Sequence, residues 1–525
     1  MLRKVLVLGV AGALLAAVGT ASAVDGPDRT VVRTDAGQVR GKTAGEVRTF
    51  EGVPYAAPPT GELRWRSPHP VRPWTGVRDA TAPASACPQQ DNPEAPGGST
   101  NEDCLYVNVT TPVKDPARPR PVVVWVPGGG FFMGAGHNYL ARRMAEQGDA
   151  VVVTINYRLG IFGFFGHHGL PGSGTFGLQD QQAALRWVQR NAAAFGGDAG
   201  NVTLAGESAG GMSTCAQLTS PGSAGLFHRA IMQSGSCDFD WPKGGQYPGQ
   251  QAGSFWVPQQ AIRQQGDEIA AKELGCPGGA GALACLRGRP PAELMKQFLA
   301  FTSSGTGSAV LPESPATALA NGRFHRVPVL SGNNRDEGRS WLTAFDNGKI
   351  DAAKYHQLVA TMAGGAAPKV EAEYPLPAYE SPAHAWGAVT TDRIWSCNQV
   401  RSDRTLSSKV PTYAYEFSDP HSPLVKAFPG PIKEGAIHGV ELPYLFDVRG
   451  ANLKLAPDQQ VLADQMVGYW TAFARTGDPN GPGRPHWAPV SRDVSGPSLK
   501  PTGQGGIATV DLAAEHHCGF WAGLR

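Results

Sequence analysis

The chain has 525 residues, and its 46 lysine and arginine residues nearly balance 44 aspartate and glutamate residues, which leaves a formal net charge of +2. Because no basic run accompanies this balance, the sequence gives no electrostatic reason to expect a nucleic acid or an anionic membrane as a partner. The length exceeds that of a usual domain, but no linker-like or highly charged segment divides the chain. We therefore expect residues 24–525 to form one large domain with insertions.

The N-terminal residues have the pattern of a secretory signal peptide. Arg3 and Lys4 precede an apolar run over residues 5–18, and a small-residue cleavage site ends at Ala23. The apolar run is too short to span a bilayer. We expect residues 1–23 to be removed and the mature protein to be secreted, either extracellular or periplasmic.

Apolar runs and helical patterns alternate along the rest of the chain. Five runs are typical of parallel strands buried on both faces, at residues 121–126, 150–155, 201–205, 230–233 and 327–330. Residues 178–194 place apolar side chains at helical spacing, and Gly196 follows as a helix-ending signal. This alternation predicts an α/β fold with a doubly wound, mostly parallel central sheet and helices on both faces. Residues 239–322 break the pattern, and we expect them to form an inserted cap over the carboxyl edge of the sheet.

Three consecutive glycines, Gly128 to Gly130, follow the first of these expected strands. Glycines let backbone N–H groups approach a reacting oxygen, and acyl transfer needs such donors around the developing oxyanion. We expect the N–H groups of Gly129 and Gly130 to form an oxyanion hole. We expect a third donor from Ala209, because it directly follows the candidate nucleophile, Ser208. A flexible glycine turn is the alternative interpretation.

Ser208 lies between two glycines in the sequence Gly206-Glu207-Ser208-Ala209-Gly210, after an expected strand and before a helix-like stretch. A strand that turns sharply into a helix needs small flanking residues so that the serine hydroxyl stays accessible. The pattern predicts a nucleophilic serine at this turn.

Eight cysteines in an exported chain favour disulfides over buried thiols. The sequence alone permits roughly a hundred connectivities, although Cys276 and Cys285 are close enough to close a small loop. No cysteine has the spacing of metal ligands, and we predict neither a metal nor a cofactor. The adjacent histidine pairs at 167–168 and 516–517 are interpreted as parts of surface loops.

In addition to the serine motif, a series of short blocks along the chain resembles the type-B carboxylesterases. This family is the carboxylesterase/lipase branch of the α/β-hydrolases, which also includes the cholinesterases. The blocks lie at residues 50–56, 58–61, 102–108, 156–160, 195–198, 201–203, 233–235, 336–338, 438–441 and 477–480. They occur in the order of the family and cover nearly the whole mature chain. The resemblance implies an α/β-hydrolase fold.

The resemblance also implies a catalytic triad, with Ser208 as nucleophile, Glu337 as acid and His438 as base. This chain order, with the acid after the serine and the histidine last, is that of the α/β-hydrolases. A histidine with a near-neutral pKa can take the serine proton, and a carboxylate can fix its tautomer.

Other residues acquire expected roles only through the resemblance. Ser234 resembles a serine that hydrogen-bonds the triad acid, and Glu207 and Glu441 resemble supporting carboxylates. Phe131 and Trp241 are expected to line the substrate pocket. The family's structural ion pairs correspond to Arg64 with Glu102 and Arg158 with Asp180. Its disulfides correspond to Cys87 with Cys104, Cys276 with Cys285, and Cys397 with Cys518, which leaves Cys215 and Cys237 to pair by elimination.

The chain departs from the family pattern in two places. Pro127 precedes the glycine triplet where the family usually has histidine or tyrosine, which puts the orientation of the loop in question. The segment between Cys87 and Cys104 contains no aromatic ring to hold a choline cation. A choline ester is therefore not the expected substrate.

Together these features predict a secreted serine esterase that acts on small carboxylic esters of short to medium acyl chains. A lipase, or a hydrolase of amide, carbamate or lactone bonds, is the alternative on the same site. A non-catalytic adhesion protein of the same fold is a remote alternative, because the chain keeps all three triad residues. A monomer is expected, although the sequence leaves the oligomeric state open.

Overall fold

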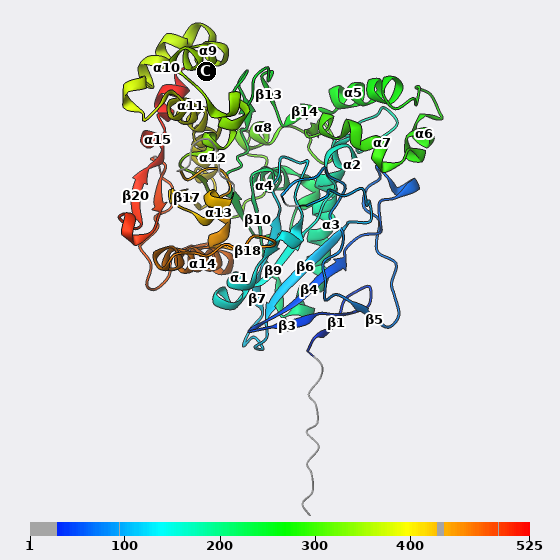
Figure 1. Ribbon diagram of the computed structural model, residues 1–525. Helices are drawn as coiled ribbons and strands as arrows, with labels where there is room; N and C mark the ends of the chain where they lie inside the picture. The colour runs from blue at the N-terminus through cyan, green and yellow to red at the C-terminus, as the bar shows by residue number, and fades with distance from the viewer. Residues whose placement is uncertain (1–28, 94, 428–434, 492, 525) are drawn as a thin grey trace, which may run out of the picture.

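A mixed sheet of 11 strands organises the molecule (Figure 1). The computed structural model describes residues 29–93, 95–427, 435–491 and 493–524, so the expected signal peptide lies outside the described residues. In spatial order the strands are β20 (Ala508–Asp511), β19 (Ser495–Leu499), β17 (Thr412–Phe417), β16 (Val329–Asn334), β11 (Arg229–Gln233), β10 (Gly197–Glu207), β7 (Arg120–Val126), β9 (Val151–Ile155), β6 (Tyr106–Pro112), β4 (Val47–Pro54) and β3 (Lys42–Ala44). Neighbours from β9 to β19 pair in parallel, and the outer pairs are antiparallel.

The central strands are apolar throughout because both of their faces are buried. Along β7, Val122, Val124 and Val126 pack into one hydrophobic core, whereas Val123 and Trp125 pack into the other. Side chains alternate across a strand, so a strand with a core on each side needs no polar position. The five predicted strands are all present, and the expected doubly wound, mostly parallel sheet is confirmed.

Helices cover both faces of this sheet. On one face lie α3 (Phe176–Asn191), α4 (Ala209–Thr219) and α12 (Cys397–Ser407), and on the other lie α1 (Arg142–Gly148) and α14 (Pro457–Thr476). The predicted glycine signal after α3 is confirmed, because Gly196 has a φ of 83° and ends the following 3-10 turn η3 (Ala192–Phe195). No helix in the described part of the chain is long and apolar enough to cross a membrane.

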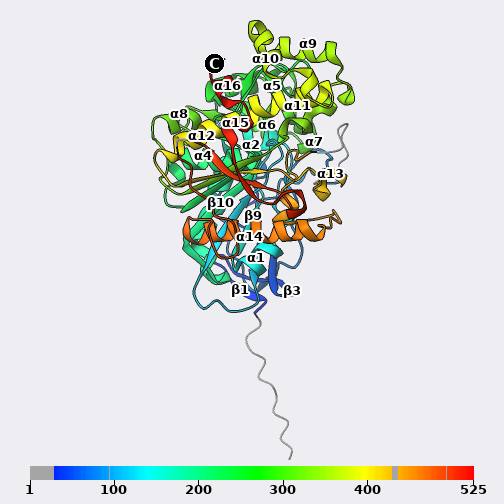
Figure 2. The ribbon, with the colours of Figure 1, turned by 90° about the vertical axis from the view of Figure 1, so that its left-hand side faces the viewer.

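Two segments gather at the end of the molecule opposite β1 (Val31–Arg33), as both views show (Figures 1 and 2). The first contains α5 (Gln259–Lys272), α6 (Ala282–Gly288) and α7 (Pro291–Leu294), within the expected cap. The second contains α9 (Ala352–Ala363), α10 (Ala367–Glu373) and α11 (Pro382–Thr390), which the sequence analysis did not assign to a cap. Insertions at two points of the chain therefore build this end.

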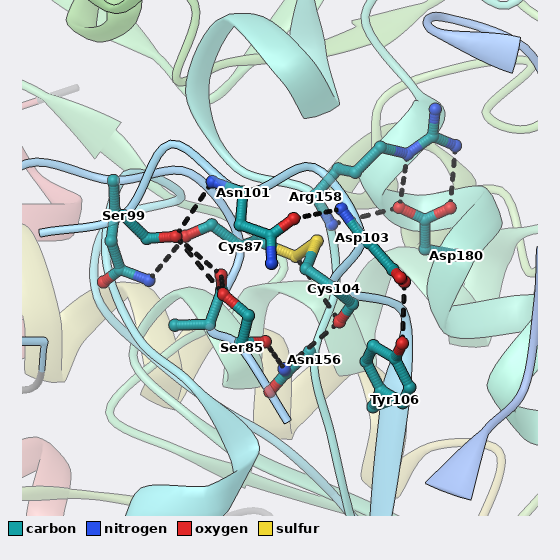
Figure 3. Close-up of a disulfide and its surroundings, with 12 residues drawn as sticks. Ser85, Cys87, Ser99, Asn101, Asp103, Cys104, Tyr106, Asn156, Arg158 and Asp180 are labelled. Atoms are coloured by element: carbon teal, nitrogen blue, oxygen red, sulfur yellow. Dashed lines mark hydrogen bonds and ion pairs between the residues drawn. A yellow bond between two sulfur atoms is a disulfide. The ribbon is translucent and has the colours of Figure 1, made fainter. Parts of the chain in front are cut away.

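Four disulfides join the eight cysteines in the pairs that were expected. Figure 3 shows the Cys87–Cys104 bridge close to the buried Arg158–Asp180 ion pair, whose closest contacts are 2.7 Å. The Arg64–Glu102 pair is also buried and has N–O distances of 2.5 and 2.7 Å.

The interpretation of the histidine pairs as surface loops was wrong for one member of each pair. His167 is 8 % exposed and His516 is 5 % exposed, whereas their neighbours His168 and His517 are at or near the surface. His516 is buried because Asp392 and Glu416, more than 90 residues away in sequence, contact its two ring nitrogens. Nothing near His516 in the sequence identifies those partners.

Candidate active site

The candidate nucleophile occupies a strained turn. Ser208 stands between β10 and α4 with φ 56° and ψ −123°, and its backbone N–H donates to Gln233 O over 2.8 Å. A Cβ atom on Gly210 would lie 2.0 Å from Val126 O, and one on Gly206 would lie 2.5 Å from the backbone of Gly210. The two flanking glycines are thus required because strand, turn and helix approach one another closely.

The glycine loop lies directly against this turn. A Cβ atom on Gly128 would meet both Glu207 Oε2, at 2.5 Å, and Ser208 Cβ, at 3.1 Å. Among the described residues, no hydrogen bond is found from the backbone N–H groups of Gly129, Gly130 and Ala209. Ala209 is the first residue of α4, so its N–H has no partner within the helix. Three donors are therefore free beside Ser208.

The loop remains oriented although Pro127 replaces the usual histidine or tyrosine. The Tyr157 hydroxyl donates to Pro127 O over 3.0 Å in the buried interior. Gln89, in the segment between Cys87 and Cys104, bonds both the N–H and the carbonyl of Gly134. These contacts hold both ends of the loop that contains the free donors.

The candidate acid and base meet across about 100 residues of sequence. His438 Nδ1 lies 2.6 Å from Glu337 Oε2, and since a carboxylate only accepts, the imidazole donates from Nδ1. Asn334 N donates to Glu337 Oε1 over 2.8 Å, and His438 N donates to Ser340 Oγ over 2.9 Å. Strand β16 and the turn after it thus place the acid and also hold the backbone of the base.

The other ring nitrogen of His438 faces a second carboxylate. Nε2 lies 3.2 Å from Glu207 Oε1, and within the described residues no hydrogen bond joins Ser208 Oγ to His438. Burial lowers the pKa of His438, but the negative charges of Glu337, Glu207 and Glu441 outweigh burial and raise it to about 9. In this state the imidazole is a cation between two glutamates at neutral pH.

The expected supporting residues divide into two groups. Glu441 is buried, accepts from Asn334 Nδ2 over 2.8 Å and from Gln233 Nε2 over 3.1 Å, and has a pKa raised chiefly by burial. The expected hydrogen bond from Ser234 to Glu337 is not found. The Ser234 hydroxyl is buried and has no hydrogen-bond partner among the described residues. The backbone N–H of Asn334 serves Glu337 in its place.

An aromatic cluster joins the two expected pocket residues to the base. Phe131 contacts Phe255, with ring centroids 5.5 Å apart, and Phe255 contacts Trp241 at 5.2 Å. Trp395 contacts Trp241 at 6.1 Å and the His438 ring at 4.5 Å. Two further rings, Phe239 and Trp341, also pack against Trp395.

Four of these six rings were not predicted from the sequence, namely Phe239, Phe255, Trp341 and Trp395. Trp341 follows Glu337 by four residues, a spacing that could have placed both on one side of a helical turn. The other three had no local signal, because their contacts depend on segments distant in the chain. No group of three or more histidine, cysteine, aspartate or glutamate side chains in the described ranges is arranged to hold a metal ion.

Comparisons with known proteins identify the family of the chain. The model of the carboxylesterase family matches residues 28–521. A para-nitrobenzyl esterase of Bacillus subtilis is 36% identical over 485 residues, which cover 86% of this chain and 90% of that protein. The human cocaine esterase is 34% identical over 86% of this chain and 82% of its own, and human carboxylesterase 3 is 34% identical over 91% and 88%. The chain therefore belongs to the carboxylesterase family of the α/β-hydrolases and is a carboxylic-ester hydrolase.

Proposed function

We propose that the protein is a secreted serine esterase, with one domain over residues 24–525, that hydrolyses esters of short to medium acyl chains. Ser208 attacks the ester carbonyl, and the N–H groups of Gly129, Gly130 and Ala209 stabilise the oxyanion. His438, oriented by Glu337, transfers the serine proton to the leaving alcohol and then activates the water that hydrolyses the acyl-enzyme.

The observation that carries this proposal is the 2.6 Å contact between His438 and Glu337 beside a turn with three free backbone donors. The nitrogen that must reach Ser208 contacts Glu207, the residue before it in the chain. A small shift of the imidazole from Glu207 to the serine hydroxyl would complete the triad, and such bonds commonly tighten only when substrate binds.

Two further features support the finer parts of the proposal. Four disulfides favour an oxidising compartment, in agreement with a signal peptide at residues 1–23. The partly exposed rings of the aromatic cluster, Trp241, Phe255 and Trp341, offer apolar surface to an acyl group of limited length.

The test is hydrolysis of p-nitrophenyl esters from acetate upward by the mature protein and by Ser208→Ala. We expect the variant to lose at least about 10³-fold in kcat, and an organophosphate to label Ser208 with one equivalent. Equal turnover by both proteins, without labelling, would refute the proposal. Emulsified triglyceride and p-nitroanilide substrates test the alternatives, since faster turnover of either would make the protein a lipase or an amidase.

A further inference from the structure

A short π-helical turn, η10 (Thr391–Ser396), lies between α11 and α12 and contacts the loop of the proposed acid, the proposed base and the aromatic cluster. Thr391 Oγ1 accepts from Gly338 N, next to the proposed acid, over 2.9 Å. The Trp395 ring packs on His438 with centroids 4.5 Å apart. π-Helical turns are rare and are found frequently at functional sites.

The same turn is also tied to the segment that carries Trp241. Arg393 forms an ion pair with Asp240 through contacts of 2.6 and 3.1 Å. Three residues at alternate positions of η10 therefore contact the acid loop, the segment that carries Trp241 and the base, and these are Thr391, Arg393 and Trp395. A displacement of this turn would disturb all three.

On its other side, η10 is held by a histidine from the C-terminal segment. His516 Nδ1 lies 2.7 Å from Asp392 Oδ1, and Nε2 lies 2.9 Å from Glu416 Oε2 on β17. All three side chains are about 5 % exposed. Burial lowers the pKa of His516, but Asp392 and Glu416 raise it to about 10, so both ring nitrogens carry protons and both donate.

Among the residues that the structure describes, no other cation pairs with Asp392 or Glu416, and the network continues into the C-terminal helix. Tyr374 donates its hydroxyl to Asp392 Oδ2 over 2.7 Å, and Trp521 Nε1 donates to that hydroxyl over 2.7 Å. Cys518, two residues after His516, forms a disulfide with Cys397 immediately after η10. The C-terminal segment is thus joined to η10 by the His516–Asp392 ion pair and to the residue directly after η10 by the Cys397–Cys518 disulfide.

We propose that His516 is a positioning residue for ester hydrolysis, which fixes η10 so that Trp395 and Thr391 hold the base and the acid loop in register. This inference rests on the triad of the proposed function. The imidazole must move from Glu207 to Ser208 while it keeps its hydrogen bond to Glu337. The Trp395 ring packed on the imidazole restricts other movements of the base. Small misplacements of such groups cost large factors in rate.

The test compares His516→Gln with the matched control His517→Gln. His517 also pairs with a carboxylate, Glu373 at 2.6 Å, but it is partly exposed, and its hydrogen bond, ion pair and ring contact go to Glu373 and Tyr374 and not to η10. We expect His516→Gln to lower kcat on p-nitrophenyl acetate by about 10- to 100-fold with little change in KM, and to shift the pH midpoint of kcat/KM. His517→Gln should keep the kcat, KM and pH midpoint of the natural protein.

A second variant guards against failure of His516→Gln to fold. Asp392→Asn keeps the side-chain shape and leaves the His516–Glu416 ion pair balanced, but removes the charge that links His516 to η10. We expect the same loss of kcat and the same shift in pH midpoint. Folded Asp392→Asn protein with natural kcat and pH midpoint would overturn the inference.

The outcome is distinct from failure of the proposed function. If Ser208→Ala retains turnover, the triad itself is wrong and no positioning role can follow from it. If Ser208→Ala is inactive while folded Asp392→Asn matches the natural enzyme in kcat and pH midpoint, only the role of His516 fails.

Discussion

At the scale of single residues, the charge state of His438 governs the proposed reaction. The imidazole has a carboxylate at each ring nitrogen, with Glu337 at 2.6 Å and Glu207 at 3.2 Å. The first contact orients the base, whereas the second places a negative charge against the nitrogen that must reach Ser208. The charges of Glu337 and Glu207 stabilise the His438 imidazolium that forms during the reaction. The same charges also keep His438 protonated before substrate reacts.

The raised pKa of His438 predicts an alkaline activity profile. Only the neutral imidazole can accept the serine proton, so kcat/KM should rise with pH through a midpoint well above 6.5, towards the pKa of about 9. Because the folded-state pKa is raised, the stabilisation from the protonated ring is present below about pH 6.5 and is lost as pH rises through 9. A pH–rate profile from pH 5 to 10 measures the midpoint, and a midpoint at or below 6.5 would contradict the geometry.

Replacing Glu207 should move that midpoint downwards. Glu207→Gln keeps the side-chain shape but removes the charge facing Nε2, so the protonated ring loses stabilisation and its pKa falls. We expect the midpoint of kcat/KM to fall measurably relative to the natural enzyme in parallel titrations. An unchanged midpoint would show that the Glu207 charge does not act on His438.

The flanking glycines give a steric prediction. Gly210→Ala would place Cβ 2.0 Å from Val126 O and displace the turn that presents Ser208, which should lower kcat/KM by about 10²-fold. Gly288→Ala is the matched control, because Gly288 is also helical, at the end of α6, and its Cβ would meet nothing within 4 Å. Natural activity in Gly210→Ala, measured on p-nitrophenyl acetate, would contradict the close packing of the turn.

At the scale of secondary-structure elements, the parallel strands place the site. Strands β7, β10, β11 and β16 are neighbours, and the glycine loop, Ser208, Ser234 and Glu337 each follow the carboxyl end of one of them. In open α/β sheets these ends meet along one edge, where ligands bind. The order of the strands thus brings together groups that are far apart in sequence.

The strands that the sequence predicted were those with uninterrupted apolar runs. Strand β17 was missed although all six of its residues are buried, because Thr412 and Glu416 interrupt an otherwise apolar run. That buried carboxylate is compensated by His516, 100 residues later, and by the Ser498 hydroxyl, which donates to its other oxygen over 3.3 Å. The outer strands β4 and β6 pair antiparallel and also include polar residues, so a search for continuous apolar runs passes over them.

Arg64 links elements from three parts of the chain. It pairs with Glu102 and donates to the backbone carbonyls of Leu286, Arg287 and Arg289 in and after α6 of the cap. Arg64→Met would leave Glu102 buried without a counter-charge, which typically costs about 3–5 kcal/mol of unfolding free energy. We expect a correspondingly lower midpoint of urea unfolding.

Arg66→Met is the control for this substitution. Arg66 is half exposed and lies 3.9 Å from Glu62, an exposed pair of the kind that contributes at most about 1 kcal/mol. Equal unfolding midpoints for the two variants would mean that the buried pair contributes no more than the exposed one.

At the scale of the whole molecule, the disulfides constrain the chain over very different lengths. Cys397–Cys518 spans 121 residues and ties the C-terminal segment to η10, whereas Cys276–Cys285 spans 9 residues within the cap. The entropy of closing a loop in the unfolded chain grows with its length and gives upper values of about 5 and about 2.5 kcal/mol, respectively.

We therefore expect replacement of Cys397 and Cys518 by serine to lower the Tm more than the same replacement of Cys276 and Cys285. Calorimetry of both double variants at one pH measures the difference. A larger loss from the 9-residue loop would show that native contacts, and not chain entropy, dominate the contribution of these bridges.

The sequence by itself determined the features that depend on nearby residues or on a family pattern. The turn at Ser208 was legible because glycines must flank it within two positions, and the central strands because burial on both faces requires apolar residues. The candidate acid and base were identified only through the resemblance, since no local feature separates His438 from the other 12 histidines.

Only the tertiary structure decided which groups contact the base and what holds them. The approach of Glu207 to Nε2, the packing of Trp395 on the ring and the burial of His516 join segments tens to hundreds of residues apart. Such contacts arise when whole elements dock, and their energies depend on mutual burial and geometry that no short stretch of sequence encodes. The type of chemistry at the site was therefore predictable from the sequence, whereas the positions and protonation states of its groups are determined by the tertiary structure.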